Sequence, residues 1–257
     1  MITCIGIDLA WSPRNPTGAA VIGGGADGGA LVETALLGDL NTIVGFVERH
    51  AGAGPAIVAV DAPLRVPNER GRRPAEAALS RAFGRYQAGA HPANRQRLTF
   101  EGIVRGEALV AMLEERGFVQ KPTVAAGEPV RQVVEVFPHP AMIALFGLQR
   151  TLKYKARPNR TLAERLAAWR EYQVHVRALA DADPPLRGHE EFVTRDVAAL
   201  RGRRLKDYED QVDALLCAYI ALYAFRWGAA RCRTFGTLDG GCIFTPVLEQ
   251  MLSDGGA

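Results

Sequence analysis

The chain has 257 residues and a formal net charge of +3, from 31 Lys and Arg against 28 Asp and Glu. An apolar content of 48% and a charged content of 23% are ordinary for a soluble globular protein, and the small net charge points to no particular partner. No apolar run approaches 18 residues and no signal peptide is visible, so we expect no membrane span and a cytoplasmic location. The four cysteines lack CxxC spacing, which argues against a zinc knuckle or a redox pair and favours reduced thiols.

The first predicted strand ends in a carboxylate. In Cys4-Ile5-Gly6-Ile7-Asp8-Leu9 the residues alternate between two faces, and Asp8 shares its face with Gly6. Gly6 has no side chain, so another element can approach the backbone just before Asp8. A buried acid costs desolvation energy unless a cation or donors meet it. The alternative is a turn residue that leads into Ser12-Pro13.

The next segments form a predicted antiparallel meander and a helix. Strands are expected at Thr17–Ile22 and Leu31–Leu37. The intervening run Gly23-Gly24-Gly25 lacks a GxxxxGK[ST] pattern, so we interpret it as a hairpin turn and not as a phosphate loop. Asp39 is the predicted N-cap of a helix that ends near Gly52.

A second buried strand, within Pro55–Pro63, also ends in an acid, Asp61. A helix precedes it, so we expect this strand to run parallel to the first. Neighbouring parallel strands end at the same edge of a sheet, where open α/β folds carry their sites. Asp8 and Asp61 should therefore lie side by side.

A basic insert occupies about residues 64–100. Eight arginines lie between Arg65 and Arg97 against two glutamates, a local excess of about six positive charges. Some of these arginines must be a solvated face. The segment leaves directly from Asp61, however, so we expect it to overhang the carboxylates. A helix is predicted next at Glu101–Gly117.

A third buried strand is predicted at Gln132–Pro140, with Glu135 near its end and a short helix from Met142. His139 lies between two prolines and is either a general base or a structural residue. A cationic segment without any acid follows, and its members are Arg150, Lys153, Lys155, Arg157 and Arg160.

The last long helix is predicted at Lys206–Trp227, after helices at Thr161–Ala180 and Glu190–Leu200. Its apolar residues recur at the helical period, and Asp213 lies at the border of that stripe. Asp210 shares this side of the helix, and Glu209 is also near.

A small hairpin at about residues 234–245 closes the chain. No internal repeat or linker divides residues 1–257, so we interpret them as a single domain with inserted segments. The order strand, strand, strand, helix, strand, helix, strand, helix is that of an RNase H-like fold. We predict an α/β fold with a mixed five-stranded sheet, in the order 3-2-1-4-5, flanked by helices.

Four short motifs carry a resemblance to a known family: Ile5-Gly6-Ile7-Asp8, Val58-Ala59-Val60-Asp61, Glu135-Val136-Phe137-Pro138 and Asp210-Gln211-Val212-Asp213-Ala214-Leu215. They resemble, in the same order, the uncharacterised microbial domain-of-unknown-function family described as predicted RNase H-like nucleases. The acid pair on the last helix also resembles that of Holliday-junction resolvases. The resemblance implies a metal-binding set in which Asp8, Asp61 and Asp213 are joined by Asp210 or Glu135.

The chemistry of such a set can be argued separately. Phosphodiester cleavage must orient a water and neutralise charge on the entering and leaving oxygens, and two Mg²⁺ or Mn²⁺ ions about 4 Å apart do both. These ions prefer hard oxygen ligands. In this hypothesis Asp8 bridges both ions, Asp61 and Asp213 hold one each, and Glu135 or Asp210 completes a shell.

The expected partner is therefore DNA or RNA. Lys155 or Lys153 would contact the scissile phosphate. Arginines of the basic insert, among them Arg65, Arg72 and Arg73, would hold backbone phosphates with an affinity that depends on salt.

Two other functions stay open. ATP-dependent phosphotransferases and ATPases of the actin and sugar-kinase type also begin with a Gly-Ile-Asp strand. They follow it with a Gly-Thr or Gly-Ser hairpin, whereas Leu9-Ala10-Trp11-Ser12-Pro13 stands here. A non-catalytic nucleic-acid-binding scaffold is the second alternative.

Overall fold

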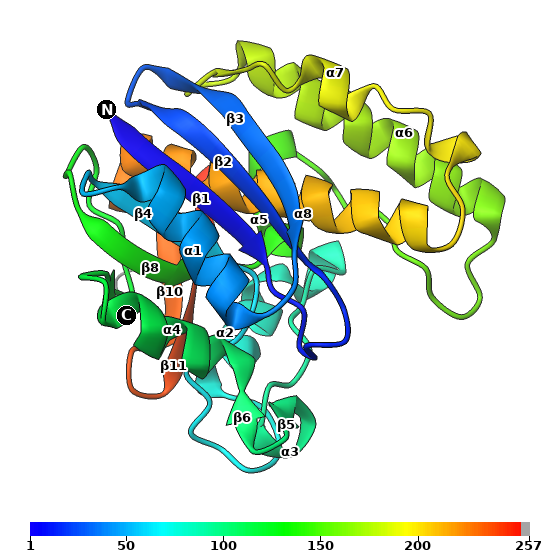
Figure 1. Ribbon diagram of the computed structural model, residues 1–257. Coiled ribbons are helices and arrows are strands. Elements are labelled where there is room, and N and C mark those ends of the chain that lie inside the picture. The colour runs from blue at the N-terminus through cyan, green and yellow to red at the C-terminus, as the bar shows by residue number, and fades with distance from the viewer. Residues whose placement is uncertain (253–257) are drawn as a thin grey trace.

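A mixed sheet of seven strands forms the centre of the computed structural model, which describes residues 1–252, and helices cover both faces of the sheet (Figure 1). The strand order is β7-β8-β4-β1-β2-β3-β9. The strands are β1 (Ile2–Asp8), β2 (Thr17–Gly25), β3 (Gly28–Leu37), β4 (Ala56–Val60), β7 (Val119–Gln120), β8 (Arg131–Glu135) and β9 (Leu186–Arg187). The α/β prediction is confirmed, but the sheet has seven strands where the sequence predicted five. The two extra strands, β7 and β9, are two-residue segments at the edges, too short to show a hydrophobic period.

Parallel and antiparallel pairing divide the sheet. β1, β4, β8 and β7 run parallel to one another, and β1, β2 and β3 form the expected antiparallel meander. At the other edge β9 pairs in parallel with β3. The helices are α1 (Leu40–Ala51), α2 (Pro74–Phe83), α3 (Arg95–Leu98), α4 (Arg105–Glu114), α5 (Pro138–Phe146), α6 (Leu162–Ala178), α7 (Glu190–Val193), α8 (Arg203–Trp227) and α9 (Glu249–Leu252). Two hairpins, β5 (Thr99–Phe100) with β6 (Ile103–Val104) and β10 (Cys232–Thr237) with β11 (Gly241–Pro246), complete the fold.

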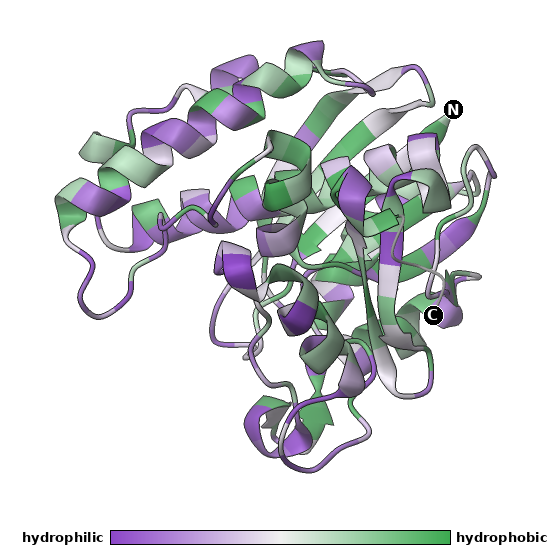
Figure 2. Cartoon of the chain, turned by 180° about the vertical axis from the view of Figure 1, so that it is seen from behind, coloured by the Kyte–Doolittle hydropathy of each residue, from purple (hydrophilic) through white to green (hydrophobic). Residues whose placement is uncertain are grey.

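Two helix layers bury the two faces of the sheet. Ile5 and Val58 pack with α1 and α4 on the face that lies in front in Figure 1. Cys4 and Ala59 pack with α8 on the opposite face. Figure 2 shows largely hydrophobic strands, whereas the outer helix α6 carries many hydrophilic residues. The alternation of side chains along β1 therefore decides that Asp8, which shares the face of Cys4, points toward α8.

Helix α8 lies directly against the sheet because two glycines lack side chains. A Cβ atom at Gly6 would lie 2.0 Å from the carbonyl oxygen of Ala214, and one at Gly18 would lie 2.0 Å from that of Asp210. Among the described residues α8 is the one helix long and apolar enough to cross a membrane, yet 78% of its most apolar window is buried in the fold. That burial is typical of a core helix.

Some predicted boundaries were wrong. The strand expected to reach Pro140 ends at Glu135, because Pro138 and Pro140 stand in the first turn of α5, where a missing N–H costs no helix hydrogen bond. The single helix expected at Glu190–Leu200 is instead α7 followed by a short 3₁₀ turn, Val197–Ala199. By contrast, the predicted N-cap of α1 is confirmed: the side chain of Asp39 accepts from the backbone N–H of Thr42. Thr161, predicted as the start of the next long helix, is the N-cap of α6 and accepts from the backbone N–H of Glu164.

Candidate functional site

The ends of β1 and β4 bring two carboxylates together. The strands pair in parallel with Ile7 opposite Val60, and the backbone N–H of Asp61 donates to the carbonyl of Ile7 at 2.8 Å. Asp8 and Asp61 follow this pair on the face covered by α8. The predicted juxtaposition of the two acids at the carboxyl edge is thus what the backbone register produces.

Helix α8 adds two further acids, Asp213 and Asp210. Asp213 is fully buried, and the close approach of α8 at Gly6 brings it to the acids of the strands. The phenol of Tyr154 donates to Asp213 Oδ1 at 2.6 Å and that of Tyr172 at 3.3 Å. Burial raises the pKa of both phenols well above its ordinary value, so both stay neutral hydrogen-bond donors.

Lys155 is the cation at the centre of these acids. Its Nζ lies 2.7 Å from Asp213 Oδ2, and the side chain is 24% exposed. Burial opposes its charge, yet Asp213, Asp8 and Asp61 hold the pKa of Lys155 well above its ordinary value. Lys155 is therefore charged and shared among the carboxylates.

The acids act on one another electrostatically. Burial raises the pKa of Asp8 well above its ordinary value, and the ammonium of Lys155 opposes this shift. Asp61, Asp213 and Asp210 each raise the same pKa further. Burial also raises the pKa of Asp61 to about 7, again against Lys155. Asp8 and Asp61 therefore hold their protons more tightly than free carboxyls do, and a divalent cation that bound them would have to displace those protons.

A second lysine, Lys206, pairs with Asp210 and Glu209. Lys206 Nζ donates to Glu209 Oε1 at 2.8 Å and to Asp210 Oδ1 at 2.6 Å. Asp210 also shares a hydrogen bond with Asp8 that lowers its pKa, although burial raises it overall. Asp210 thus joins the cluster at its rim.

Glu135, an expected metal ligand, lies near enough to Asp61 to raise the pKa of that acid, but Arg73 binds its carboxylate. It pairs in register with Val60, which faces α1 and α4, so strand alternation points Glu135 away from the face of Asp61. Its Oε2 accepts from Arg73 Nη1 at 3.0 Å and from the backbone N–H of Leu64 at 2.8 Å. Both carboxylate oxygens are engaged by Arg73, which leaves Glu135 a structural role.

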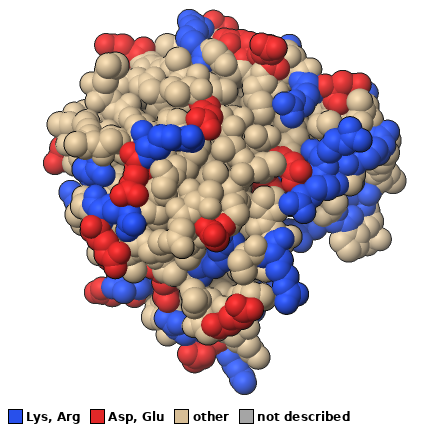
Figure 3. Space-filling view, viewed as in Figure 1, with Lys and Arg blue, Asp and Glu red and all other residues tan. Residues whose placement is uncertain are grey.

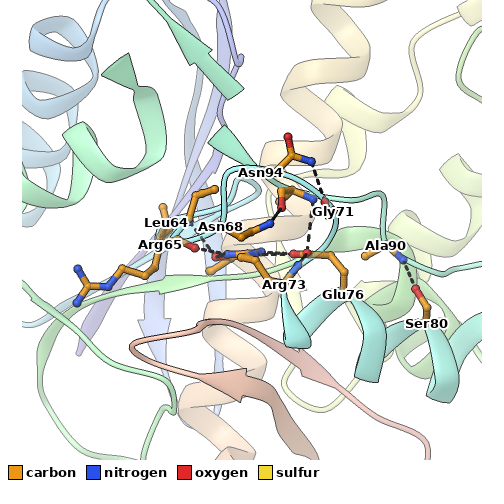
Figure 4. Close-up of polar contacts among 12 residues, drawn as sticks. Leu64, Arg65, Asn68, Gly71, Arg73, Glu76, Ser80, Ala90 and Asn94 are labelled. Atoms are coloured by element: carbon orange, nitrogen blue, oxygen red, sulfur yellow. Dashed lines mark hydrogen bonds and ion pairs between the residues drawn. The ribbon is translucent and has the colours of Figure 1, made fainter. Parts of the chain in front are cut away.

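The expected contact of Arg73 with phosphates is also corrected. Arg73 is 1% exposed, and its Nε donates to Glu76 Oε1 at 2.7 Å (Figure 4). Its Nη1 donates further to the carbonyl of Arg65 at 2.8 Å. The guanidinium is buried and its donors point to protein acceptors, so it cannot reach a nucleic-acid backbone.

A cleft of about 570 Å³ opens over Asp8 and Asp61. Lys155 and Arg157 line one part of it, and Trp11 and His91 line another. Within residues 1–252 its lining does not include Arg65, Arg72 or Lys153, all of which are exposed. The basic insert does reach the carboxylates, as predicted, but through residues 87–91 and not through those arginines.

His139 also lines this cleft. Burial, together with the nearby ammonium of Lys155, lowers its pKa to about 3. Its Nδ1 lies 3.0 Å from Thr151 Oγ1, in a hydrogen bond. A group that is protonated only near pH 3 is a poor general base at neutral pH, so a structural role is favoured.

The donor set suits a hard divalent cation. Aspartate oxygens are the ligands that Mg²⁺ and Mn²⁺ prefer. Oδ2 of Asp213 is buried and accepts no regular hydrogen bond from the described residues, with Lys155 as its ionic neighbour. In residues 1–252 no three His, Cys, Asp or Glu side chains are arranged closely enough to hold an ion. A metal would therefore require Lys155 to withdraw and the carboxylates to turn inward.

A comparison with models of protein families identifies the family to which the chain belongs. A family model described as "Protein of unknown function (DUF429)" matches residues 6–235. The chain belongs to the DUF429 family. The resemblance to an uncharacterised domain-of-unknown-function family is confirmed, and the match spans Asp8 to Asp213. No curated protein and no solved structure matches the chain.

Sequence pattern did not reveal the tyrosines and the indole at the site of this DUF429 chain. Tyr154 stands between Lys153 and Lys155, so its place beside a cationic residue was visible, but nothing in the pattern indicated that it turns inward to Asp213. Tyr172 lies on an expected amphipathic helix, where its spacing is typical of a core residue. Trp11 follows Asp8 by three positions, and this closeness in sequence could have indicated that Trp11 lies near the site.

Proposed function

We propose that this protein is a metal-dependent nuclease that hydrolyses phosphodiester bonds with Mg²⁺ or Mn²⁺. The observation that carries the proposal is the convergence of Asp8, Asp61 and Asp213 beneath a cleft with a cationic wall. The central strand order β3-β2-β1-β4-β8 is also the order expected of an RNase H-like fold, which supports the same conclusion.

Each residue has a role in this proposal. Asp8, whose pKa responds to Asp61, Asp213 and Asp210, would hold a shared position between two ions, with the other acids around it. Two ions, when bound, would orient a water and neutralise charge on the leaving oxygen. Tyr154 and Tyr172 fix the orientation of Asp213 through its Oδ1.

Lys155 has two tasks in sequence. Without metal it neutralises part of the acidic cluster from 2.7 Å. With a phosphodiester in the cleft, its partly exposed ammonium is free to pair with a phosphate oxygen instead. Lys155 would thus exchange a carboxylate partner for a phosphate partner, so the same lysine stabilises the metal-free site and binds the substrate.

A cleavage assay tests the proposal. Labelled single-stranded, duplex and junction substrates of DNA and RNA are incubated with Mn²⁺ and then with EDTA. We expect metal-dependent cleavage that Asp8→Asn reduces by about 100-fold or more, since it removes a charged ligand of both ions. Asp239→Asn, which changes a 98% exposed acid, is the matched control and should cut normally.

Either of two results would overturn the nuclease. One is undiminished cleavage by the folded Asp8→Asn variant. The other is no cleavage of any substrate by the folded wild type. In the second case, nucleic-acid binding alone would favour a scaffold, and stabilisation by ATP with Mg²⁺ would favour a phosphotransferase.

A further inference from the structure

An exposed tryptophan stands at the mouth of the carboxylate cleft. Trp11 is 51% exposed and lines the cleft together with Asp8 and Asp61. A large aromatic side chain left in water gives up the free energy that its burial would supply. What distinguishes Trp11 is its place at the mouth of this cleft, where an exposed indole is available to stack against the ring of a ligand.

The backbone around Trp11 is held firmly. Arg105, which is 5% exposed, donates from Nη1 to the carbonyl of Ala10 at 2.9 Å and to that of Ser12 at 3.0 Å. Its Nη2 donates to the carbonyl of Gly38 at 3.1 Å. A buried guanidinium thus fixes the chain on both sides of Trp11, and the indole is displayed from a rigid support.

A second cleft, of about 550 Å³, adjoins the first and shares Lys155 and Arg157 with it. It lies between α6 and the start of α8, where Arg165, Arg201 and Lys206 line it. Figure 3 shows Lys and Arg side chains gathered over this part of the molecule.

The arginines of this second cleft are not neutralised by the fold. Within residues 1–252 no carboxylate forms an ion pair with Arg157, Arg165 or Arg201, and the side chains of the last two donate to backbone carbonyls. A row of unpaired guanidinium groups continuous with an acidic site fits a ligand that carries phosphates at regular intervals.

We propose that an unpaired strand of nucleic acid lies along this path, with one base stacked on Trp11 and the next phosphates on Arg157, Arg165 and Arg201. This inference rests on the proposed nuclease function and names its substrate class. Stacking on an indole requires a base that is free of its partner, which selects a single strand or an unpaired junction arm over a continuous duplex.

Binding can be measured without cleavage. The full chain with Asp8→Asn, in EDTA, is titrated against a fluorescein-labelled 20-nucleotide DNA strand and its duplex. We expect Trp11→Ala to weaken single-strand binding by about 5- to 150-fold, the range for loss of one stacked base, and duplex binding far less. Trp11→Phe should retain most of the affinity but lose the quenching of tryptophan fluorescence that accompanies binding.

Charge reversal tests the arginines. The pair Arg157→Glu and Arg165→Glu should weaken single-strand binding and reduce the salt slope by about 0.7 for each phosphate that is no longer neutralised. The pair Arg65→Glu and Arg72→Glu makes the same change in net charge on the basic insert and should stay within about threefold of the parent protein. Thermal unfolding confirms that each variant is folded.

The path is overturned if Trp11→Ala and the paired cleft variant both bind as the parent does, or if the insert pair loses as much affinity. These outcomes can be distinguished from a failure of the nuclease proposal. Binding as expected without Mn²⁺-dependent cleavage by the wild type removes the nuclease and leaves a single-strand-binding path. Cleavage at wild-type rates by the cleft variants removes the path and leaves the nuclease.

Discussion

Two regions of this protein are rich in arginine, and they differ in how far the fold pairs those arginines with carboxylates. In the basic insert, residues 64–100, Arg73 pairs with Glu76 and Glu135, Arg95 with Glu107 and Arg65 with Asp239. The other arginines of the insert form no ion pair with a described carboxylate: Arg70, Arg72, Arg81, Arg85 and Arg97. Around the second cleft, Arg157, Arg165 and Arg201 meet no carboxylate within residues 1–252. Local excess of charge in a sequence therefore says little about binding, because the fold decides which cations are already neutralised.

Removal of Arg73 should have the largest effect. Arg73→Met leaves Glu76 and Glu135 buried without their cation, which costs about 3–5 kcal/mol of unfolding free energy. Arg165→Ala, in the second cleft, should change stability by less than about 0.5 kcal/mol. Urea unfolding of the two variants measures the contrast, and an equal loss in both would erase the distinction between the regions.

A substitution at Gly6 tests how closely α8, which borders the second cleft, packs on β1. A Cβ atom there would lie 2.0 Å from Ala214 O and 2.3 Å from Ala218 N, so α8 must move away from β1. Gly6→Ala should cost at least about 2 kcal/mol, the scale of overpacking a dense core.

Gly45 provides the matched control for Gly6. It lies on the exposed side of α1 with no atom within 4 Å of an added Cβ. Gly45→Ala should stabilise the protein by up to about 1 kcal/mol through helix propensity. A tolerated Gly6→Ala would contradict the close packing of α8 that brings Asp213 to the strand ends.

The last prediction concerns the pH dependence of stability without metal. The pKa of Asp61 is about 7 in the folded protein and 3.8 in an unfolded chain, so between these values the native state holds a proton that the unfolded state has released. Wild type should lose stability relative to Asp61→Asn as pH rises from about 4 to 7, and the difference should level off above pH 7.

His139 acts in the opposite direction over much of this range, because its lowered pKa makes acid destabilising. The comparison with Asp61→Asn cancels that contribution, so unfolding of both proteins across the pH range isolates Asp61. A difference that is flat, or that grows in favour of wild type with pH, would contradict the burial of this carboxylate among other acids.

Much of the site could be predicted from the sequence, because the hydrophobic periodicity and the order of the strands determine where its acids lie. The strands that end at Asp8 and Asp61 have continuous apolar runs, and a helix between them makes them parallel. Asp213 was placed by its position at the edge of an apolar helical stripe. These features depend on local pattern and on a few topological rules.

The remainder depends on contacts between distant segments. Glu135 ends one buried strand, and Asp61 directly follows another. The register with Val60 turns Glu135 to the other face of the sheet, where Arg73 pairs with it. The inward turn of Tyr154 and the unpaired state of Arg165 likewise follow from tertiary packing. Sequence pattern alone cannot distinguish an arginine that the fold neutralises from one that it leaves free.

A crystal structure of the full chain soaked with Mn²⁺, with anomalous diffraction measured at the manganese edge, would show whether these acids bind metal. We expect anomalous peaks within coordination distance of Asp8 and Asp213, with Lys155 Nζ withdrawn from its 2.7 Å contact with Asp213. Saturating Mn²⁺ that leaves no peak at this cluster, with Lys155 still in place, would contradict metal binding by these acids.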